Sequence, residues 1–360
     1  MKNKKLISQN VRTLFIKPSR PIVGDIKLDP VRVARNIASG VETSLALDTN
    51  ILISIEKVVK NGNKWSSVKM QGLHNFVKLL EKCPSGSICI SPGLALNEMP
   101  PELAQQALDA FEEFCSVHLP GFRDTPNCTR VKYNGKKENY GYLDLSLDGQ
   151  ATIALPFISI LFLNLVDKKS SSKSFGKFKE YFDLIESKID VLSATEIEIA
   201  KYCFAEPPAD CRETIELRKQ IRHNFLKTSD GKAPKNSDEV LAIAFNGACD
   251  IILLHSANLL DTNGLDGVEQ DSWIATKDKK LVDFCNIFHH VNHDGEAGKY
   301  AARTEHPEHA KDPYWMQVDT EFKLRHFRRL AHHVDRETDI IGMVDVAKDA
   351  MREIEQAFDS

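Results

Sequence analysis

The chain has 360 residues, of which 42% are hydrophobic and 27% are charged, and its formal net charge at pH 7 is −4. This length and composition are typical of a soluble globular protein with one large or two ordinary domains. The small net charge excludes an overall basic surface, so any contact with nucleic acid must come from a local patch or from metal ions.

The cysteines and the apolar stretches indicate a cytoplasmic protein. Eight cysteines are scattered without Cys-x-x-Cys spacing, which argues against a zinc ribbon and against a dense disulfide scaffold. Residues 1–20 lack the continuous apolar stretch of a signal peptide. The most apolar stretch, 151–166, would span about 24 Å as a helix, against about 30 Å for a bilayer core. We therefore predict a buried helix there and no membrane partner.

The N-terminal segment, 1–40, predicts an extended arm that lies over a core. Residues that interrupt a regular period recur within it: Pro18, Pro21, Gly24 and Pro30.

The segment 41–118 alternates short apolar strands with helices, as α/β proteins do. The predicted strands cover 45–47 and 87–91, and the predicted helices cover 51–59 and 68–82. Asp48 directly follows the first strand, and Glu98 lies in a helical stretch after the second. We assign this segment to the first half of an α/β core.

The segment 119–230 interrupts the alternation. It begins with a loop-like region rich in Pro, Gly, Asn and Tyr and then becomes helical. Its predicted helices cover 151–166, 175–187, 194–204 and 212–227. We interpret it as a mostly helical insertion.

The α/β pattern returns in the segment 231–295, the second half of the core. Ser237 and Asp238 predict the start of a helix over 239–247, because both side chains can cap a helix. Short strands are predicted over 272–276 and 287–291. The segment 296–360 carries apolar residues at helical spacing and predicts a C-terminal helical extension.

Acidic residues follow the ends of the predicted core strands. Asp48, Glu98 and Asp278 do so, and Asp238 joins them from the first turn of its own helix. Open α/β sheets place their sites at this edge. Two carboxylates about 5 Å apart repel by on the order of 3 kcal/mol at an effective dielectric constant near 20, which a divalent cation would relieve. Mg²⁺ and Mn²⁺ prefer oxygen ligands, so the cluster predicts metal-dependent hydrolysis of a phosphate ester.

The sequence around these acids resembles the motifs of PIN-domain nucleases. LALDTNILI, from Leu45, resembles the family's opening strand with its acid-Thr-Asn sequence. DEVLAIA from Asp238 and IATKDKKL from Ile274 are similar to the third-acid and fourth-acid motifs, and ICIS followed by Glu98 fits the second acid. The intervals between acids, 238 − 98 = 140 and 278 − 238 = 40 residues, exceed those of compact PIN domains. We infer insertions at both places, the second around 250–270.

The resemblance implies a three-layer fold, with a central and mainly parallel sheet between helices, and an endonuclease activity that usually acts on RNA. Asp48, Glu98, Asp238 and Asp278 would be catalytic and would hold one or two Mg²⁺ or Mn²⁺ ions, while Asn50 and Thr276 would orient a carboxylate or the attacking water. The products would carry 5′-phosphate and 3′-hydroxyl ends. RNA is the expected substrate, although DNA also fits. A toxin or defence effector and an RNA-processing enzyme are both compatible settings.

Each acid also has a structural interpretation. Asp48 and Asp238 are suitable helix caps, Glu98 suits a solvated helix face, and Asp278 suits a turn. The alternative function is therefore a catalytically inactive PIN-like module that binds RNA or a protein. The presence of all four acids favours the enzyme. A haloacid-dehalogenase-type phosphatase is disfavoured, because Asn50 stands where that family has a second Asp.

Basic residues flank the proposed site in sequence. Candidate phosphate contacts are Lys277, Lys279, Lys280, Arg325, Arg328 and Arg329. Such residues bind nucleic-acid backbones in a salt-dependent manner, although a charge run is more often a solvated face.

Histidines are frequent from residue 289 onward, and His290 and His293 could share a zinc ion. Their spacing matches no zinc signature, so we favour core or solvated histidines. A long helical tail is compatible with a homodimer, and an inhibitory protein could cover an acidic cleft. The sequence does not choose between these partners.

Overall fold

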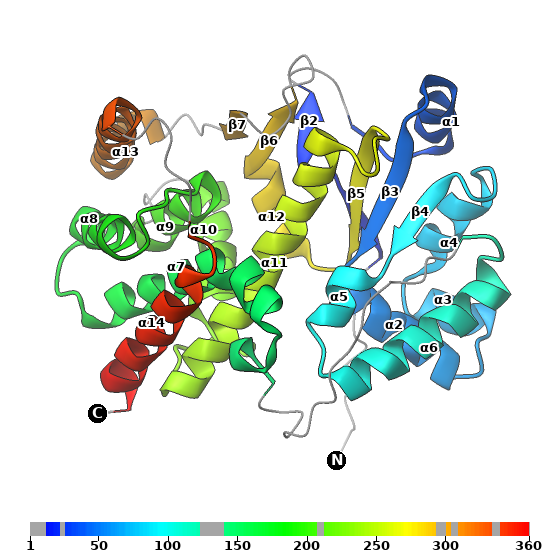
Figure 1. Cartoon of the computed structure of the whole chain (residues 1–360), viewed down its shortest axis with the longest axis horizontal. Coiled ribbons are helices and arrows are strands. Elements are labelled where there is room, and N and C mark those ends of the chain that lie inside the picture. Colours follow the sequence, from blue (N-terminus) through cyan, green and yellow to red (C-terminus); the bar gives the residue numbers. More distant parts are fainter. Residues whose placement is uncertain are drawn as a thin grey trace. The chain divides into compact units, whose positions relative to one another are not determined.

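The computed structural model describes residues 12–21, 26–122, 140–206, 212–292, 300–303, 309–332 and 339–359. The protein is mixed α/β and consists mainly of helices (Figure 1). It divides into two compact units. The first comprises 1–137, 253–285 and 289–300, and the second comprises 138–252, 286–288 and 301–360.

The first unit contains a four-stranded mixed sheet with the strand order β1-β5-β3-β4 (Figure 1). The strands are β1 (Leu14–Ile16), β3 (Glu42–Leu47), β4 (Ile88–Ser91) and β5 (Gln270–Thr276). β3 is parallel to both of its neighbours, and β1 is antiparallel to β5. The carboxyl ends of β3, β4 and β5 therefore lie at the same edge of the sheet.

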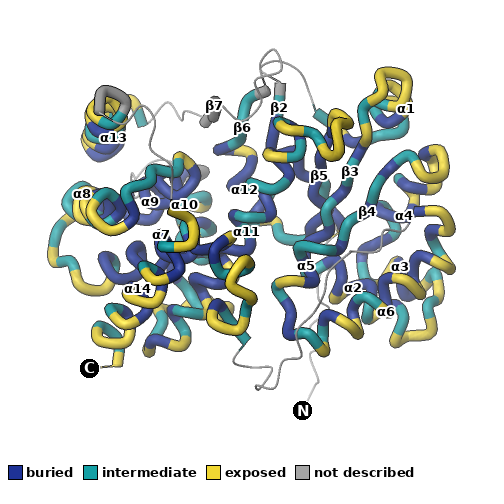
Figure 2. The backbone as a smooth tube through the Cα atoms, in the orientation of Figure 1, coloured by how far each residue is buried: buried dark blue, intermediate teal, exposed yellow. Residues whose placement is uncertain are grey.

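Helices of the first unit cover this sheet with apolar side chains. They are α1 (Pro30–Ser39), α2 (Thr49–Lys60), α3 (Trp65–Met70), α4 (His74–Glu81), α5 (Gly93–Asn97), α6 (Pro101–His118) and α12 (Lys279–Ile287). Leu45 and Leu47 of β3, Ile51 and Ile55 of α2, and Phe111 of α6 belong to one buried cluster. Figure 2 shows these elements buried on their inward faces. This packing fixes α2, and with it the residue that starts α2, against the sheet.

The N-terminal segment is more ordered than the sequence predicted. In place of an extended arm over the core, it supplies the edge strand β1, the short strand β2 (Ser19–Pro21) and the helix α1. Pro30 does not interrupt α1 but begins it, because proline suits the first helical position, and Asp29 caps that end. β2 pairs in parallel with β6 (Phe288–Asn292) in a second sheet that also contains β7 (Tyr300–Arg303).

The helix predicted over 68–82 is instead two helices, α3 and α4. Gly72 lies between them with φ +69°, a left-handed conformation that glycine adopts without steric cost. The backbone N–H of Gly72 donates to Lys69 O at 3.1 Å, which ends α3. One glycine therefore turns the chain where the apolar periodicity alone predicted a continuous helix.

The described residues of the second unit are mainly helical. It contains α7 (Leu147–Lys169), α8 (Ser174–Leu184) with a π turn (Ile185–Ile189), α9 (Ala194–Phe204), α10 (Arg212–Leu226), α13 (Pro313–His332) and α14 (Gly342–Phe358). The long helix α11 (Ser237–Asn263) begins here and ends in the first unit. α14 packs against α7. The predicted insertion and C-terminal extension thus share one compact unit.

Two helices, α7 and α11, are long and apolar enough to cross a membrane if only length and composition are considered. Within the protein, 78% of the apolar window of α7 is buried, as the sequence predicted for a core helix. Asn164, in the middle of α7, also donates to Phe225 O at 3.0 Å, so its polar group is satisfied by the protein itself. The 27 residues of α11 account for much of the interval between Asp238 and Asp278.

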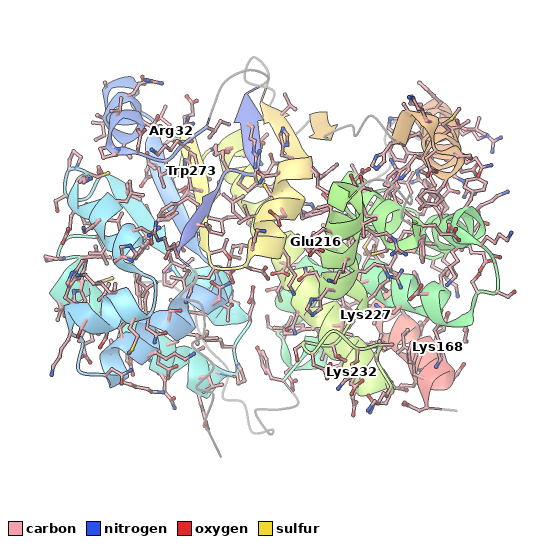
Figure 3. The ribbon with its side chains drawn as sticks, turned by 180° about the vertical axis from the view of Figure 1, so that it is seen from behind. Arg32, Lys168, Glu216, Lys227, Lys232 and Trp273 are labelled. Atoms are coloured by element: carbon pink, nitrogen blue, oxygen red, sulfur yellow. The ribbon has the colours of Figure 1, made fainter. Side chains whose placement is uncertain are left out.

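A buried ionic network joins four elements of the first unit at the amino ends of β3 and β5. Lys17 contacts Asp271 at 2.9 Å and also Asp261 at the end of α11. Arg32 of α1 makes two hydrogen bonds to Asp271, at 2.7 and 2.8 Å, and its guanidinium lies over the Trp273 ring (Figure 3). Burial opposes ionisation of Asp271, but Arg32 and Lys17 outweigh it and hold its pKa below the usual range. Burial raises the pKa of Asp261 to about 6 despite Lys17.

Removing the cation from this network is expected to destabilise the protein strongly. Lys17→Met would leave two buried carboxylates with one guanidinium, so we expect a loss of about 3–5 kcal/mol in the free energy of unfolding. Urea denaturation would measure this loss. Lys27→Met, at an exposed position of the same segment, is the matched control and should change stability by less than about 0.5 kcal/mol. Equal stability of the two variants would contradict a structural role for the network.

Candidate functional site

Asp48 lies at the carboxyl edge of the sheet, between β3 and α2. Its backbone N–H donates to Ala275 O of β5 at 3.0 Å, which continues the pairing of the two strands by one residue. Its side chain caps α2 by accepting from the backbone N–H of Asn50 at 3.4 Å. The residue is 7% exposed. Asp48 therefore caps a helix, and its position as the cap places its carboxylate at the carboxyl edge of the sheet.

Asn50 and Thr276 hold the Asp48 carboxylate. The Thr276 hydroxyl and the Asn50 side-chain amide both donate to the same carboxylate oxygen. The amide of Asn50 also donates to Thr276 Oγ1 at 3.2 Å, and the backbone N–H of Asp278 donates to that oxygen at 2.9 Å. Residues from two separated sequence motifs thus form one hydrogen-bonded set.

Asp278 lies two residues beyond the end of β5 and immediately precedes α12. Its carboxylate accepts from the backbone N–H of Lys280 at 2.7 Å, so it also caps the helix. Burial raises the pKa of Asp48, hydrogen bonds from Thr276 and Asn50 lower it, and the negative charge of Asp278 raises it again. The two carboxylates are therefore close enough to repel, which is the electrostatic setting that a cation would relieve.

Glu98 directly follows α5, and its side chain contacts the first residue of α2. The hydroxyl of Thr49 donates to its carboxylate. Burial raises the pKa of Glu98 to about 8, with the Thr49 hydrogen bond lowering it and the charge of Asp48 raising it. Thr49 was not predicted as a site residue. The acid-Thr-Asn motif contains it, but no local pattern indicates that it contacts the second acid.

Asp238 is exposed in the first turn of α11 and belongs to the second unit. The described geometry of the site accordingly consists of the first-unit residues Asp48, Glu98 and Asp278. Among the residues that the structure describes, no three His, Cys, Asp or Glu side chains form a group that could hold one metal ion. A role for Asp238 stays a prediction from the sequence.

Lys277 has a different environment from that of a phosphate contact. Its ammonium donates to Ser54 Oγ at 3.0 Å and to Gln71 O at 3.1 Å, and its backbone N–H donates to Asn50 Oδ1 at 2.8 Å. Burial, with a smaller effect of Lys57, lowers its pKa. Lys277 thus links Asn50 to Ser54 and Gln71 within the first unit. Lys279 is exposed and approaches Asp283 at 3.7 Å.

The arginines of α13 are mostly engaged with carboxylates of the second unit. Arg325 is 7% exposed and contacts Asp183, Glu186 and Glu321 at 2.6–2.8 Å. Arg329 pairs with Asp190 at 2.5 Å. These contacts favour a structural role for both, and only Arg328 of the three is exposed.

Two histidine rings, those of His255 and His290, lie beside each other with their centroids 6.1 Å apart. Burial and the two neighbouring histidines, His255 and His289, lower the pKa of His290 to about 4. This is the environment of a neutral core histidine. His293, the suggested partner of His290 in a zinc site, lies outside the described residues.

Comparison with known proteins found no matching family model, no matching curated protein and no matching solved structure. The resemblance to PIN domains rests on the sequence motifs quoted above.

The raised pKa of Glu98 predicts a pH-dependent stability in the absence of divalent cations. The folded protein keeps a proton on Glu98 that the unfolded chain loses above its ordinary pKa of 4.5. Stability should therefore be greatest below pH 4.5, as far as this group is concerned, and fall as pH rises toward 8. Glu98→Gln should remove this contribution, so that in EDTA the variant gains at least about 1 kcal/mol on wild type between pH 5 and 9.

Urea denaturation at several pH values would measure this difference. Glu112→Gln, an exposed position on α6, makes the same chemical change without burial and should follow the wild-type curve. A Glu98→Gln curve parallel to wild type would show that Glu98 ionises normally.

Proposed function

We propose that this protein is a metal-dependent endonuclease with a PIN-like fold in its first unit, and that it hydrolyses RNA to 5′-phosphate and 3′-hydroxyl ends. The observation that carries the proposal is the Asp48–Thr276–Asn50 set, because the two sequence motifs most similar to the family meet in it. Asp278 stands beside this set, and its charge acts on Asp48.

The donor set fits a hard divalent cation. Asp48 and Asp278 supply carboxylate oxygens, and in the described part of the chain neither carboxylate accepts a hydrogen bond from a lysine or arginine side chain that would offset their mutual repulsion. Mg²⁺ is commonly held by one or two carboxylates, with water and substrate phosphate completing its coordination. Asp48 and Asp278 would hold the ion, with Glu98 and Asp238 as the further ligands that the sequence suggests. When bound, such an ion activates water and stabilises the charge that develops on the phosphate.

The protein's own part in this reaction is positioning. The side chains of Thr276 and Asn50 donate to one oxygen of Asp48, and the backbone N–H of Asn50 donates to the other at 3.4 Å. The Thr49 hydroxyl donates to Glu98, and the backbone N–H of Lys277 donates to the side chain of Asn50. Because these hydrogen bonds hold the carboxylates, substrate and ion would meet groups that are already oriented, which lowers the cost of reaching the transition state.

A non-catalytic PIN-like module that binds RNA or a protein is the second candidate. It is favoured by one observation: within the described ranges, no group of three potential ligands could hold an ion. Such a module would use Asp48 and Asp278 only to cap α2 and α12. It differs from the enzyme in needing neither metal binding nor cleavage.

Replacing Asp48 tests the nuclease directly. Asp48→Asn keeps the size of the side chain and removes its charge, so we expect at least a 100-fold loss of Mn²⁺-dependent cleavage of labelled single-stranded RNA. Asp278→Asn should give a similar loss. Mn²⁺ should raise the melting temperature of wild type and not of Asp48→Asn, because a ligand stabilises only the fold that binds it. EDTA should abolish both effects.

Asp109→Asn is the matched control, since Asp109 is exposed on α6 and lies outside the acidic set. It should retain the cleavage rate and the metal response of wild type. RNA cleavage that survives in both Asp48→Asn and Asp278→Asn would refute the proposed site. Wild type that shows neither metal stabilisation nor cleavage, yet binds RNA or a protein, would support the non-catalytic module.

A further inference from the structure

A group of basic side chains surrounds the end of α9 in the second unit. Arg218 and Arg222 lie one turn apart on α10, and Lys227 directly follows that helix. All three act electrostatically on the buried thiol of Cys203. Burial raises the pKa of this thiol to about 12, although the three positive charges lower it. These residues, which we call the α10 basic cluster, therefore share one region although none was a candidate in the sequence analysis.

The charge of the α10 basic cluster is poorly balanced. Its carboxylate neighbour is Asp167, which contacts Arg222 at 3.0 Å and also Lys177 at 3.3 Å. Among the described residues, four cations thus face one carboxylate. Burial and the neighbouring charge of Arg222 lower the pKa of both Arg218 and Lys227. The cluster is electrostatically unfavourable as it stands, and an anionic ligand would reduce that cost.

Several donors in the cluster have no acceptor among the described residues. Arg222 donates to Cys203 O and to Asp167, and Arg218 donates through Nε to Ala205 O. Over the described part of the chain, the two terminal amino groups of Arg218 have no acceptor, and the ammonium of Lys227 has neither hydrogen bond nor ion pair. Both side chains are only partly buried, so a ligand in solution can reach them.

Helix capping explains part of this arrangement. Cys203 and Ala205 lie at the carboxyl end of α9, where cations interact favourably with the helix dipole and with the last carbonyl groups. This accounts for Arg222 and for one nitrogen of Arg218. It does not account for Lys227 or for the remaining donors of Arg218.

The number of cations indicates a ligand with several negative charges. Arg218, Arg222 and Lys227 carry three positive charges, and among the described residues the carboxylate that opposes them is Asp167. A nucleic-acid strand supplies one negative charge with each nucleotide. Guanidinium and ammonium groups suit the backbone of a nucleic acid and carry no preference for its bases.

We propose that Arg218 and Lys227, supported by Arg222, bind backbone phosphates of the single-stranded RNA on which the first unit acts. The proposal rests on the proposed function for the identity of the ligand. It assigns the second unit a substrate-binding role and replaces Arg325 and Arg329, whose cations are already paired, as the basic residues of that unit that meet RNA.

Binding without cleavage separates this proposal from the nuclease activity. Fluorescence anisotropy of a labelled 20-nucleotide single-stranded RNA would be recorded in EDTA, with Asp48→Asn as the parent protein, over 50–300 mM KCl. The double variant Arg218→Gln/Lys227→Gln should bind at least tenfold more weakly at 100 mM. Its salt dependence, the slope of log K against log [KCl], should be shallower by about 1.4, or 0.7 for each lost phosphate contact on a single strand.

Two further variants make the result interpretable. Lys219→Gln removes a charge from an exposed position of α10 that already faces Glu216 at 3.9 Å, and it should leave affinity and slope unchanged. Arg218→Lys keeps the charge and should retain most of the affinity, which distinguishes phosphate binding from loss of the α9 cap. Thermal unfolding would verify that each variant is folded.

Several outcomes would overturn the proposal. These are an unchanged affinity and slope in the folded double variant, an equal loss in Lys219→Gln, or no RNA binding by the parent protein at 50 mM KCl. Competition by millimolar inorganic phosphate would also overturn it, since it would indicate a site for one phosphate. Absence of cleavage or of metal binding by wild type would refute the proposed function alone and leave these binding results intact.

Discussion

The candidate site depends on the register of two parallel strands, β3 and β5. Leu47 stands opposite Ala275, so the next residues along, Asp48 and Thr276, become neighbours at the carboxyl edge. A shift of one residue would turn Thr276 to the other face of the sheet and remove its hydrogen bond to Asp48. The register is held in turn by Ser44 and Ser272, whose hydroxyls are hydrogen-bonded across the same two strands at 2.9 Å.

Local sequence patterns predicted the elements around this site well. The strand before Asp48, the helix after it, and the strands that precede Glu98 and Asp278 all form close to their predicted positions. Each is specified by neighbours in sequence: a short apolar run for the strand, and a capping side chain for the helix. The contact of Asn50 and Thr276 with Asp48 brings two of these motifs together, because Thr276 ends β5 and Asn50 lies in the first turn of α2.

Other features depend on partners that are distant in sequence and could not be predicted from local patterns. Lys17 is a single lysine among prolines, and its burial requires Asp261 and Asp271, more than 240 residues away. Likewise, Lys277 and Arg325 were candidate phosphate contacts. In the structure, Ser54 and Gln71 accept hydrogen bonds from Lys277, and three carboxylates pair with Arg325. The grouping of 301–360 with 138–252 has the same cause, since α14 packs on α7.

The sheet order has a consequence for the synthesis of this protein. β5 lies between β1 and β3, yet it is made last, after the chain has passed through most of the second unit. β1 and β3 therefore emerge from the ribosome some 230–260 residues before the strand that joins them, since 276 − 47 = 229 and 276 − 14 = 262. Closing so long a loop is slow, and it leaves two strands without their common partner in the meantime. For the same reason, Asp48 has neither Thr276 nor Asp278 beside it until β5 and the residues after it have been synthesised.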